Sequence, residues 1–151
     1  QWRGPNRDGK AADTGLAKTW PAGGPELVWS VTDPAVVGIG YGSPAVVGDK
    51  LYLLGGIGDA EDFCVALNAK DGKPGWKTPI GKRLKNNWGD GPRSTPTVDG
   101  DTLYVLAGQG ELSALNRVDG TLKWQKSLTK DFGGSVPTWG YSEPPLGDGE
   151  L

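Results

Sequence analysis

The chain has 151 residues, including 26 Gly, 12 Pro, 7 Trp, one Cys and no His. Its 16 basic and 18 acidic residues leave a net charge of −2, which gives no electrostatic case for binding nucleic acid or a membrane surface. The lack of His excludes a Ser-His triad and a His-based zinc motif, and the single Cys64 excludes an internal disulfide. No apolar run approaches the roughly 18 residues that a membrane span needs.

Residues 1–25 are predicted to be an N-terminal extension, with the sequence WRGPNRDG at residues 2–9. The chain starts at Gln1 instead of Met, which indicates that a leader has been removed or that the sequence is an excised piece. Residues 26–33 include the stretch ELVWSV around Trp29, and we expect them to form a single strand.

Residues 40–80 are predicted to hold four short strands joined by tight turns. The second strand, KLYLLGG, is apolar at consecutive positions and is expected to be buried on both faces. The third, DFCVALN, carries Cys64 as a buried thiol, and the fourth centres on Trp76. The turn between them contains Asp71-Gly72, where Gly accepts a positive φ. Three acids around the start of the third strand are expected to form a solvated loop: Asp59, Glu61 and Asp62.

The same pattern returns in residues 92–128, where ALNRVDGTLKW repeats the earlier ALNAKDGKPGW after 48 residues. Residues 140–151 begin a third copy that is cut off. A four-stranded antiparallel sheet that recurs about every 40–50 residues is typical of a β-propeller blade. We therefore predict an all-β fold: a partial ring with a closing outer strand at 26–33, two full blades and the start of a third.

The two repeated segments resemble the tryptophan-docking motif of quinoprotein propellers, A-x-D-x-x-T-G-x-x-x-W. In each copy Ala, Gly and Trp match, whereas Asn stands for the first Asp and Asp stands for Thr. These replacements keep side chains that form hydrogen bonds within the turn. A WD40 blade fits less well because the chain has no His, and a kelch blade fits less well because the double Gly at 55–56 is not repeated. The resemblance covers roughly residues 26–151.

The resemblance implies the PQQ-like repeat fold of secreted bacterial propellers. That fold occurs in pyrroloquinoline-quinone (PQQ) dehydrogenases and in cofactor-free periplasmic scaffold proteins. The dehydrogenases use an Asp base and a calcium ion, and many have a disulfide between adjacent cysteines. That cysteine pair is absent here, and we assign no residue a catalytic or metal-binding role.

In a propeller, the loops that lead from one blade to the next lie on one face near the central channel. Five side chains of these loops are candidates for a ligand-binding collar: Tyr41, Trp88, Arg93, Trp139 and Tyr141. Aromatic rings stack on a planar ligand and Arg pairs with its carboxylates, so PQQ would suit such a collar. The alternative is that these aromatic residues anchor the loops by packing on the blade below.

Two functions remain open from the sequence. The first is a secreted or periplasmic binding or scaffold module that holds a protein partner or a small-molecule ligand on its loop face. The second is the N-terminal part of a PQQ-dependent alcohol or sugar dehydrogenase, with PQQ and calcium as cofactors. In both, the remainder of the propeller or other copies must close the ring, because open blade faces and edges promote aggregation.

Overall fold

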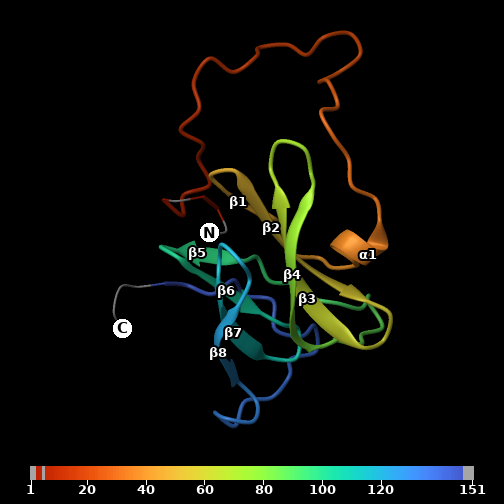
Figure 1. Cartoon of the computed structure of the whole chain (residues 1–151), viewed down its shortest axis with the longest axis vertical. Helices are drawn as coiled ribbons and strands as arrows, with labels where there is room; N and C mark the ends of the chain where they lie inside the picture. Colours follow the sequence, from red (N-terminus) through yellow and green to blue (C-terminus); the bar gives the residue numbers. More distant parts are fainter. Residues whose placement is uncertain (1–2, 5, 148–151) are drawn as a thin grey trace.

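The computed structural model describes residues 3, 4 and 6–147 and shows two β-sheets side by side (Figure 1). Each sheet is antiparallel and four-stranded, with the strands in chain order across it. The first contains β1 (Ala45–Val47), β2 (Lys50–Ile57), β3 (Glu61–Asn68) and β4 (Pro74–Lys82). The second contains β5 (Thr97–Asp99), β6 (Thr102–Leu106), β7 (Glu111–Asn116) and β8 (Leu122–Ser127). The predicted fold class, all-β with four-stranded antiparallel blades, is confirmed.

One short helix, α1 (Pro34–Val37), precedes the first sheet. Asp33 caps it by accepting a hydrogen bond from the backbone N–H of Ala35 at 2.8 Å, and Pro34 occupies the first turn, where its missing N–H costs nothing. This four-residue helix is too short to cross a membrane, and the described residues contain no longer one.

The turns that join the last two strands of each sheet depend on the Asn and Asp side chains that depart from the repeat motif. Asn68 Oδ1 accepts from the N–H of Lys70 at 2.8 Å, and Asn116 Oδ1 accepts from the N–H of Val118 at 2.9 Å. Asp119 likewise accepts from the N–H of Thr121 at 2.9 Å. The departures therefore preserve the turn, as the sequence predicts.

The main core lies between the two sheets. β2, β3 and β4 supply one side of it, and β6, the residue after β6 and β7 supply the other, with these buried residues: Tyr52, Leu54, Cys64, Ala66, Ile80, Leu103, Val105, Ala107 and Leu115. A second cluster covers the opposite face of the first sheet, where Phe63, Val65 and Leu67 pack against α1. The strand β3 is thus buried on both faces, whereas in β2, for which the sequence predicts the same, Leu51 and Leu53 on the outer face are only partly buried. The predicted burial of Cys64 is confirmed, and burial raises the pKa of its thiol.

The repeated tryptophans dock on the repeated turns one repeat further along the chain. The indole N–H of Trp29 donates to the carbonyl of Ala69 at 3.1 Å, and that of Trp76 donates to the carbonyl of Arg117 at 3.3 Å. Ala69 and Arg117 occupy the same place in the two motifs. Each indole also lies over a glycine of its turn, so the two contacts are copies of one interaction.

Those glycines, Gly72 and Gly120, have no room for a side chain. A Cβ atom on Gly72 would lie 2.7 Å from Trp29 Cε3, and one on Gly120 would lie 2.5 Å from Trp76 Cε3. Both glycines have a positive φ, of 70° and 76°, which is a further reason for Gly at these positions. The contact between consecutive repeats is therefore built from an indole ring, a carbonyl and a glycine.

The ends of the chain carry the remaining expected segments. Residues 26–33 form no strand among the described residues, and the chain from about residue 10 to 30 leaves the sheets as an open arch (Figure 1). Their role as the outer strand of a closing blade stays a prediction. Residues 141–147 of the expected third copy have no strand, and residues 148–151 lie outside the described part.

We expect Gly120→Ala to lower the free energy of unfolding by about 2–4 kcal/mol. An alanine at a positive φ costs about 1–2 kcal/mol, and the Cβ would in addition overpack the Trp76 ring. Urea unfolding of the purified chain measures this difference.

Gly100→Ala is the matched control. Gly100 also has a positive φ, of 53°, but a Cβ there would have nothing within 4 Å. It should cost only the backbone part, about 1–2 kcal/mol. Equal losses for the two variants would contradict a role of Gly120 in docking the indole.

Candidate functional site

One end of both sheets carries the long loops. Because Glu61 at the start of β3 pairs with Lys82 at the end of β4, the β2–β3 turn and the loop after β4 emerge at the same edge. The second sheet repeats this arrangement, with Glu111 opposite Ser127. We call this edge the loop face; it comprises residues 38–44, 58–60, 83–96, 107–110 and 128–144. The short turns at 48–49 and 69–73 lie at the opposite edge.

The structure brings the two predicted loop tryptophans together. The ring centroids of Trp88 and Trp139 lie 5.2 Å apart, with the ring planes tilted by 46°. Trp88 is 70% exposed and Trp139 is 50% exposed. Each indole therefore packs partly on the other. Because both rings stay largely exposed, neither is buried in the blade below.

Tyr41 and Arg93 form a second pair. The guanidinium carbon of Arg93 lies 5.0 Å from the centre of the Tyr41 ring. The guanidinium donates to the carbonyl of Gly91 at 2.9 Å and to that of Gly89 at 2.8 Å. Two carbonyls and one ring thus fix Arg93 in place, which uses part of its capacity to bind an anion.

Tyr141, the fifth predicted residue, packs against Gly110. Its hydroxyl donates to the carbonyl of Ser135 at 3.1 Å, and its N–H donates to the carbonyl of Gly108 at 2.9 Å. The predicted collar is thus two pairs and one loop-supporting tyrosine.

Two pockets open on the loop face, and most of their lining was not predicted. The larger, of about 410 Å³, is lined by Lys85, Asn86, Asn87, Trp88, Asp90 and Thr138. The smaller, of about 290 Å³, is lined by Tyr41, Ser43, Arg93, Thr95, Ser142, Glu143 and Pro144. The sequence signal for the larger one was present: the polar run Asn86-Asn87 directly precedes a loop tryptophan.

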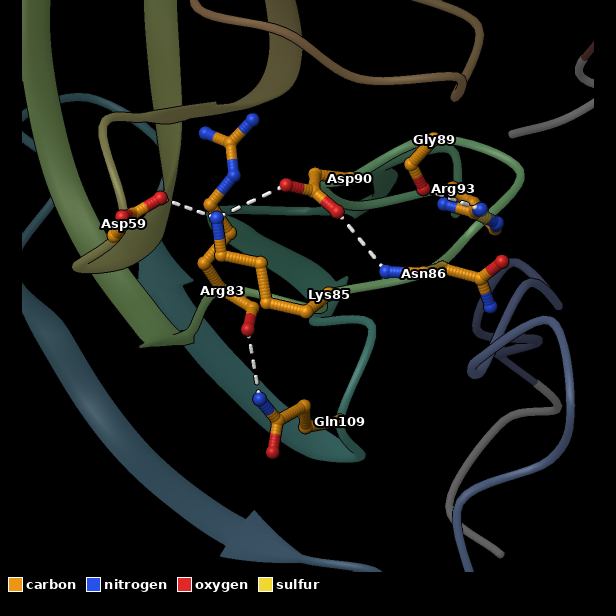
Figure 2. Close-up of polar contacts among 8 residues, drawn as sticks. All are labelled: Asp59, Arg83, Lys85, Asn86, Gly89, Asp90, Arg93 and Gln109. Atoms are coloured by element: carbon orange, nitrogen blue, oxygen red, sulfur yellow. Dashed lines mark hydrogen bonds and ion pairs between the residues drawn. The ribbon is translucent and has the colours of Figure 1, made fainter.

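A charge network supports the larger pocket (Figure 2). Lys85 forms ion pairs with Asp59 of the β2–β3 turn and, at 3.0 Å, with Asp90. The other carboxylate oxygen of Asp90 accepts from the N–H of Asn86 at 2.9 Å. That amide, and next Lys85, lower the pKa of Asp90, while the two carboxylates raise the pKa of Lys85. The network ties the two loops together through opposite charges.

Below the loop face, a buried polar cluster lies between the two sheets. Asp62 is fully buried, Arg83 is 6% exposed, and Glu111 reaches toward Gly81 from the second sheet. Both oxygens of Asp62 lack a hydrogen bond of normal geometry within the described structure. Burial raises the pKa of Asp62 to about 7, against the opposing effects of the Leu84 amide and the Arg83 charge.

The expectation that Asp59, Glu61 and Asp62 form a solvated loop is therefore wrong for Asp62. The strand β3 starts at Glu61, and strand alternation turns the next side chain into the contact between the sheets. Asp59 and Glu61 are exposed, as expected.

The residues that the structure describes do not fit PQQ with calcium. They contain no group of three or more carboxylate, Cys or His side chains that would hold a metal ion. The 46° tilt between Trp88 and Trp139 leaves no parallel slot for a flat ring system. Arg93 is engaged by backbone carbonyls, and Lys85 is neutralised by two carboxylates. A cofactor with several carboxylates would find few free positive groups here.

Comparison with known proteins relates the chain to one family. The family described as outer membrane protein assembly factor BamB matches residues 13–149. BamB of Salmonella typhimurium (strain LT2) is 32% identical over 133 residues, covering 83% of this chain and 30% of the relative. BamB of Escherichia coli (strain K12) is 30% identical over 110 residues, covering 69% of this chain and 26% of the relative. The chain spans less than a third of the length of these relatives.

Solved structures share the fold. A europium-containing methanol dehydrogenase superposes with a TM-score of 0.54 and 20% identity, covering 83% of this chain and 21% of that enzyme. A quinohemoprotein alcohol dehydrogenase of Pseudomonas putida HK5 superposes with a TM-score of 0.52 and 20% identity, covering 70% of this chain and 15% of that enzyme. At this identity the likeness concerns the fold alone.

The buried Asp62 predicts a stability that depends on pH. Its pKa rises from 3.8 to about 7 on folding, so between those pH values the folded protein keeps a proton that the unfolded chain releases. The free energy of unfolding should therefore fall as pH rises from about 4 to 7 and then level off, with an upper bound on the order of 4 kcal/mol. Urea unfolding at pH 5, 6, 7 and 8 measures the slope.

Asp62→Asn should remove most of that slope, because the amide does not titrate. Glu61→Gln serves as the control, since it neutralises an exposed carboxylate one residue away. An unchanged slope in Asp62→Asn would show that Asp62 does not carry the effect.

Proposed function

Since the chain belongs to the family of the outer membrane protein assembly factor BamB and has its PQQ-like repeats, we propose that it is a secreted or periplasmic binding and scaffold module. In this proposal, the two sheets are blades of a β-propeller, and the rest of the propeller or other copies complete the ring. The loop face holds the partner.

The observation that carries the proposal is the exposed pair Trp88 and Trp139. Each comes from a different inter-blade loop, and together they place two large apolar rings in solvent. Tryptophans are enriched among the residues that dominate binding energy at interfaces. Strands, ion pairs and turn hydrogen bonds fix the loops beneath them, so little ordering is needed when a partner binds.

The names of the relatives support a location in the cell envelope. The matched family and its members are called outer membrane protein assembly factors. We propose on this basis that the chain works in the periplasm or outside the cell, and that a protein is one class of partner for its loop face.

The alternative, a PQQ-dependent alcohol or sugar dehydrogenase, rests on the fold shared with the two enzymes. Fold alone does not establish an activity. We favour the binding and scaffold role because the exposed tryptophan pair supports it directly.

Photocrosslinking in the native host tests the use of the loop face. With a photoreactive phenylalanine analogue at position 139, which keeps an aromatic ring there, we expect a discrete crosslinked product after irradiation. Mass spectrometry would identify the attached molecule.

The same analogue at position 118 is the control. Val118 is 68% exposed but lies in the β7–β8 turn, at the opposite edge of the sheet. Equal yields at the two positions, or no product at position 139, would contradict binding at the loop face.

A further inference from the structure

We infer that the larger pocket of the loop face binds a neutral saccharide, with the sugar ring against Trp88 and its hydroxyl groups on the polar rim. This inference rests on the proposed use of the loop face and names a ligand class for it. The pocket has a volume of about 410 Å³, which lies within the range of about 300–1,000 Å³ for small-molecule sites.

The charges of the pocket favour an uncharged ligand. Lys85 is the one basic side chain of the lining, and it forms ion pairs with both Asp59 and Asp90. A phosphate or carboxylate ligand would compete with those two carboxylates and would meet their negative charge. A cationic ligand would compete with Lys85 for the same groups. A ligand without charge would leave these ion pairs, which Figure 2 draws, intact.

The apolar wall suits one face of a sugar ring. The C–H groups on that face carry slight positive charge, and they meet the negative face of an indole. Trp88 exposes 70% of its surface, and Trp139 stands next to it at an angle of 46°. The two rings form an open wedge that would hold a saccharide from one side and leave its other side in water.

The polar rim supplies hydrogen-bond donors and acceptors that the fold does not use. The Asn86 side chain is committed, since it donates to the Thr138 carbonyl at 2.6 Å and accepts from the Trp88 N–H at 3.0 Å. By contrast, the side-chain amide of Asn87 has no hydrogen-bond partner among the residues that the structure describes, although it lines the pocket. Its donor and acceptor together match adjacent sugar hydroxyls. Asn86 thus builds the loop, and Asn87 is available to the ligand.

Isothermal titration of the full chain with cellotriose, maltotriose and chitotriose tests the inference. We expect at least one of these neutral trisaccharides to bind with a Kd between about 10 μM and 5 mM. Trp88→Ala should weaken binding roughly tenfold or more by removing the apolar wall. Asn87→Ala should weaken it roughly fivefold, the effect of about one neutral hydrogen bond.

Asn87→Ala is not expected to disturb the fold, because that side chain is exposed and makes no hydrogen bond within the described structure. A loss of binding in this variant would therefore report on the pocket itself. Val118→Ala, at the opposite edge, is the matched control and should leave the Kd unchanged. Trigalacturonic acid is the charged probe and should bind at least tenfold more weakly than the best neutral trisaccharide.

The inference is overturned if none of the neutral trisaccharides binds, if trigalacturonic acid binds more tightly, or if neither Trp88→Ala nor Asn87→Ala weakens binding. A polypeptide crosslinked at position 139 together with no saccharide binding would overturn the saccharide alone and leave the loop face as a protein-binding surface. The absence of both a crosslink and saccharide binding would overturn the loop-face proposal as well.

Discussion

The contact on which the structure depends is the docking of a tryptophan on the turn of the following repeat. A sheet of four short strands cannot bury its apolar faces by itself, so each repeat needs a neighbour. The indole supplies a large apolar surface and one N–H donor, and the turn supplies a carbonyl and a glycine without a side chain. Trp29 and Trp76 make the same contact, so this contact is a repeated feature of the fold.

This docking contact also helps to determine where the candidate site lies. The docking of Trp76 joins the first sheet to the turn of the second, and the strand order brings the long loops of both repeats to one edge. Trp88 and Trp139 are 51 positions apart in the sequence and meet only because their sheets are adjacent. The Lys85 network then ties the β2–β3 turn to the inter-blade loop. The site is therefore a product of two repeats, and either one alone would lack half of the tryptophan pair.

Much of the fold could be predicted from the sequence, because strand alternation and Asp-Gly turns are local signals. The burial of Cys64 was predicted from its apolar neighbours, and the turn role of the Asn and Asp replacements from the Asp-Gly turns. The burial of Asp62 did not follow, because a carboxylate near a loop is usually solvated and only the neighbouring sheet covers this one. The loop tryptophans were found, but their pairing and the Lys85 network depend on contacts between repeats that no local pattern encodes. The helix α1 was not predicted, although Asp33 followed by Pro34 is a typical helix start. We expected a strand at residues 26–33 instead.

The most direct test compares Trp76→Ala with Trp124→Ala in urea unfolding of the 151-residue chain. Trp76 lies on the turn of the second sheet, whereas Trp124 is 42% exposed, and no turn of a further repeat covers it in the described structure. If docking holds the sheets together, Trp76→Ala should lower the free energy of unfolding by about 3 kcal/mol or more and Trp124→Ala by less than half of that. Equal losses would contradict the account.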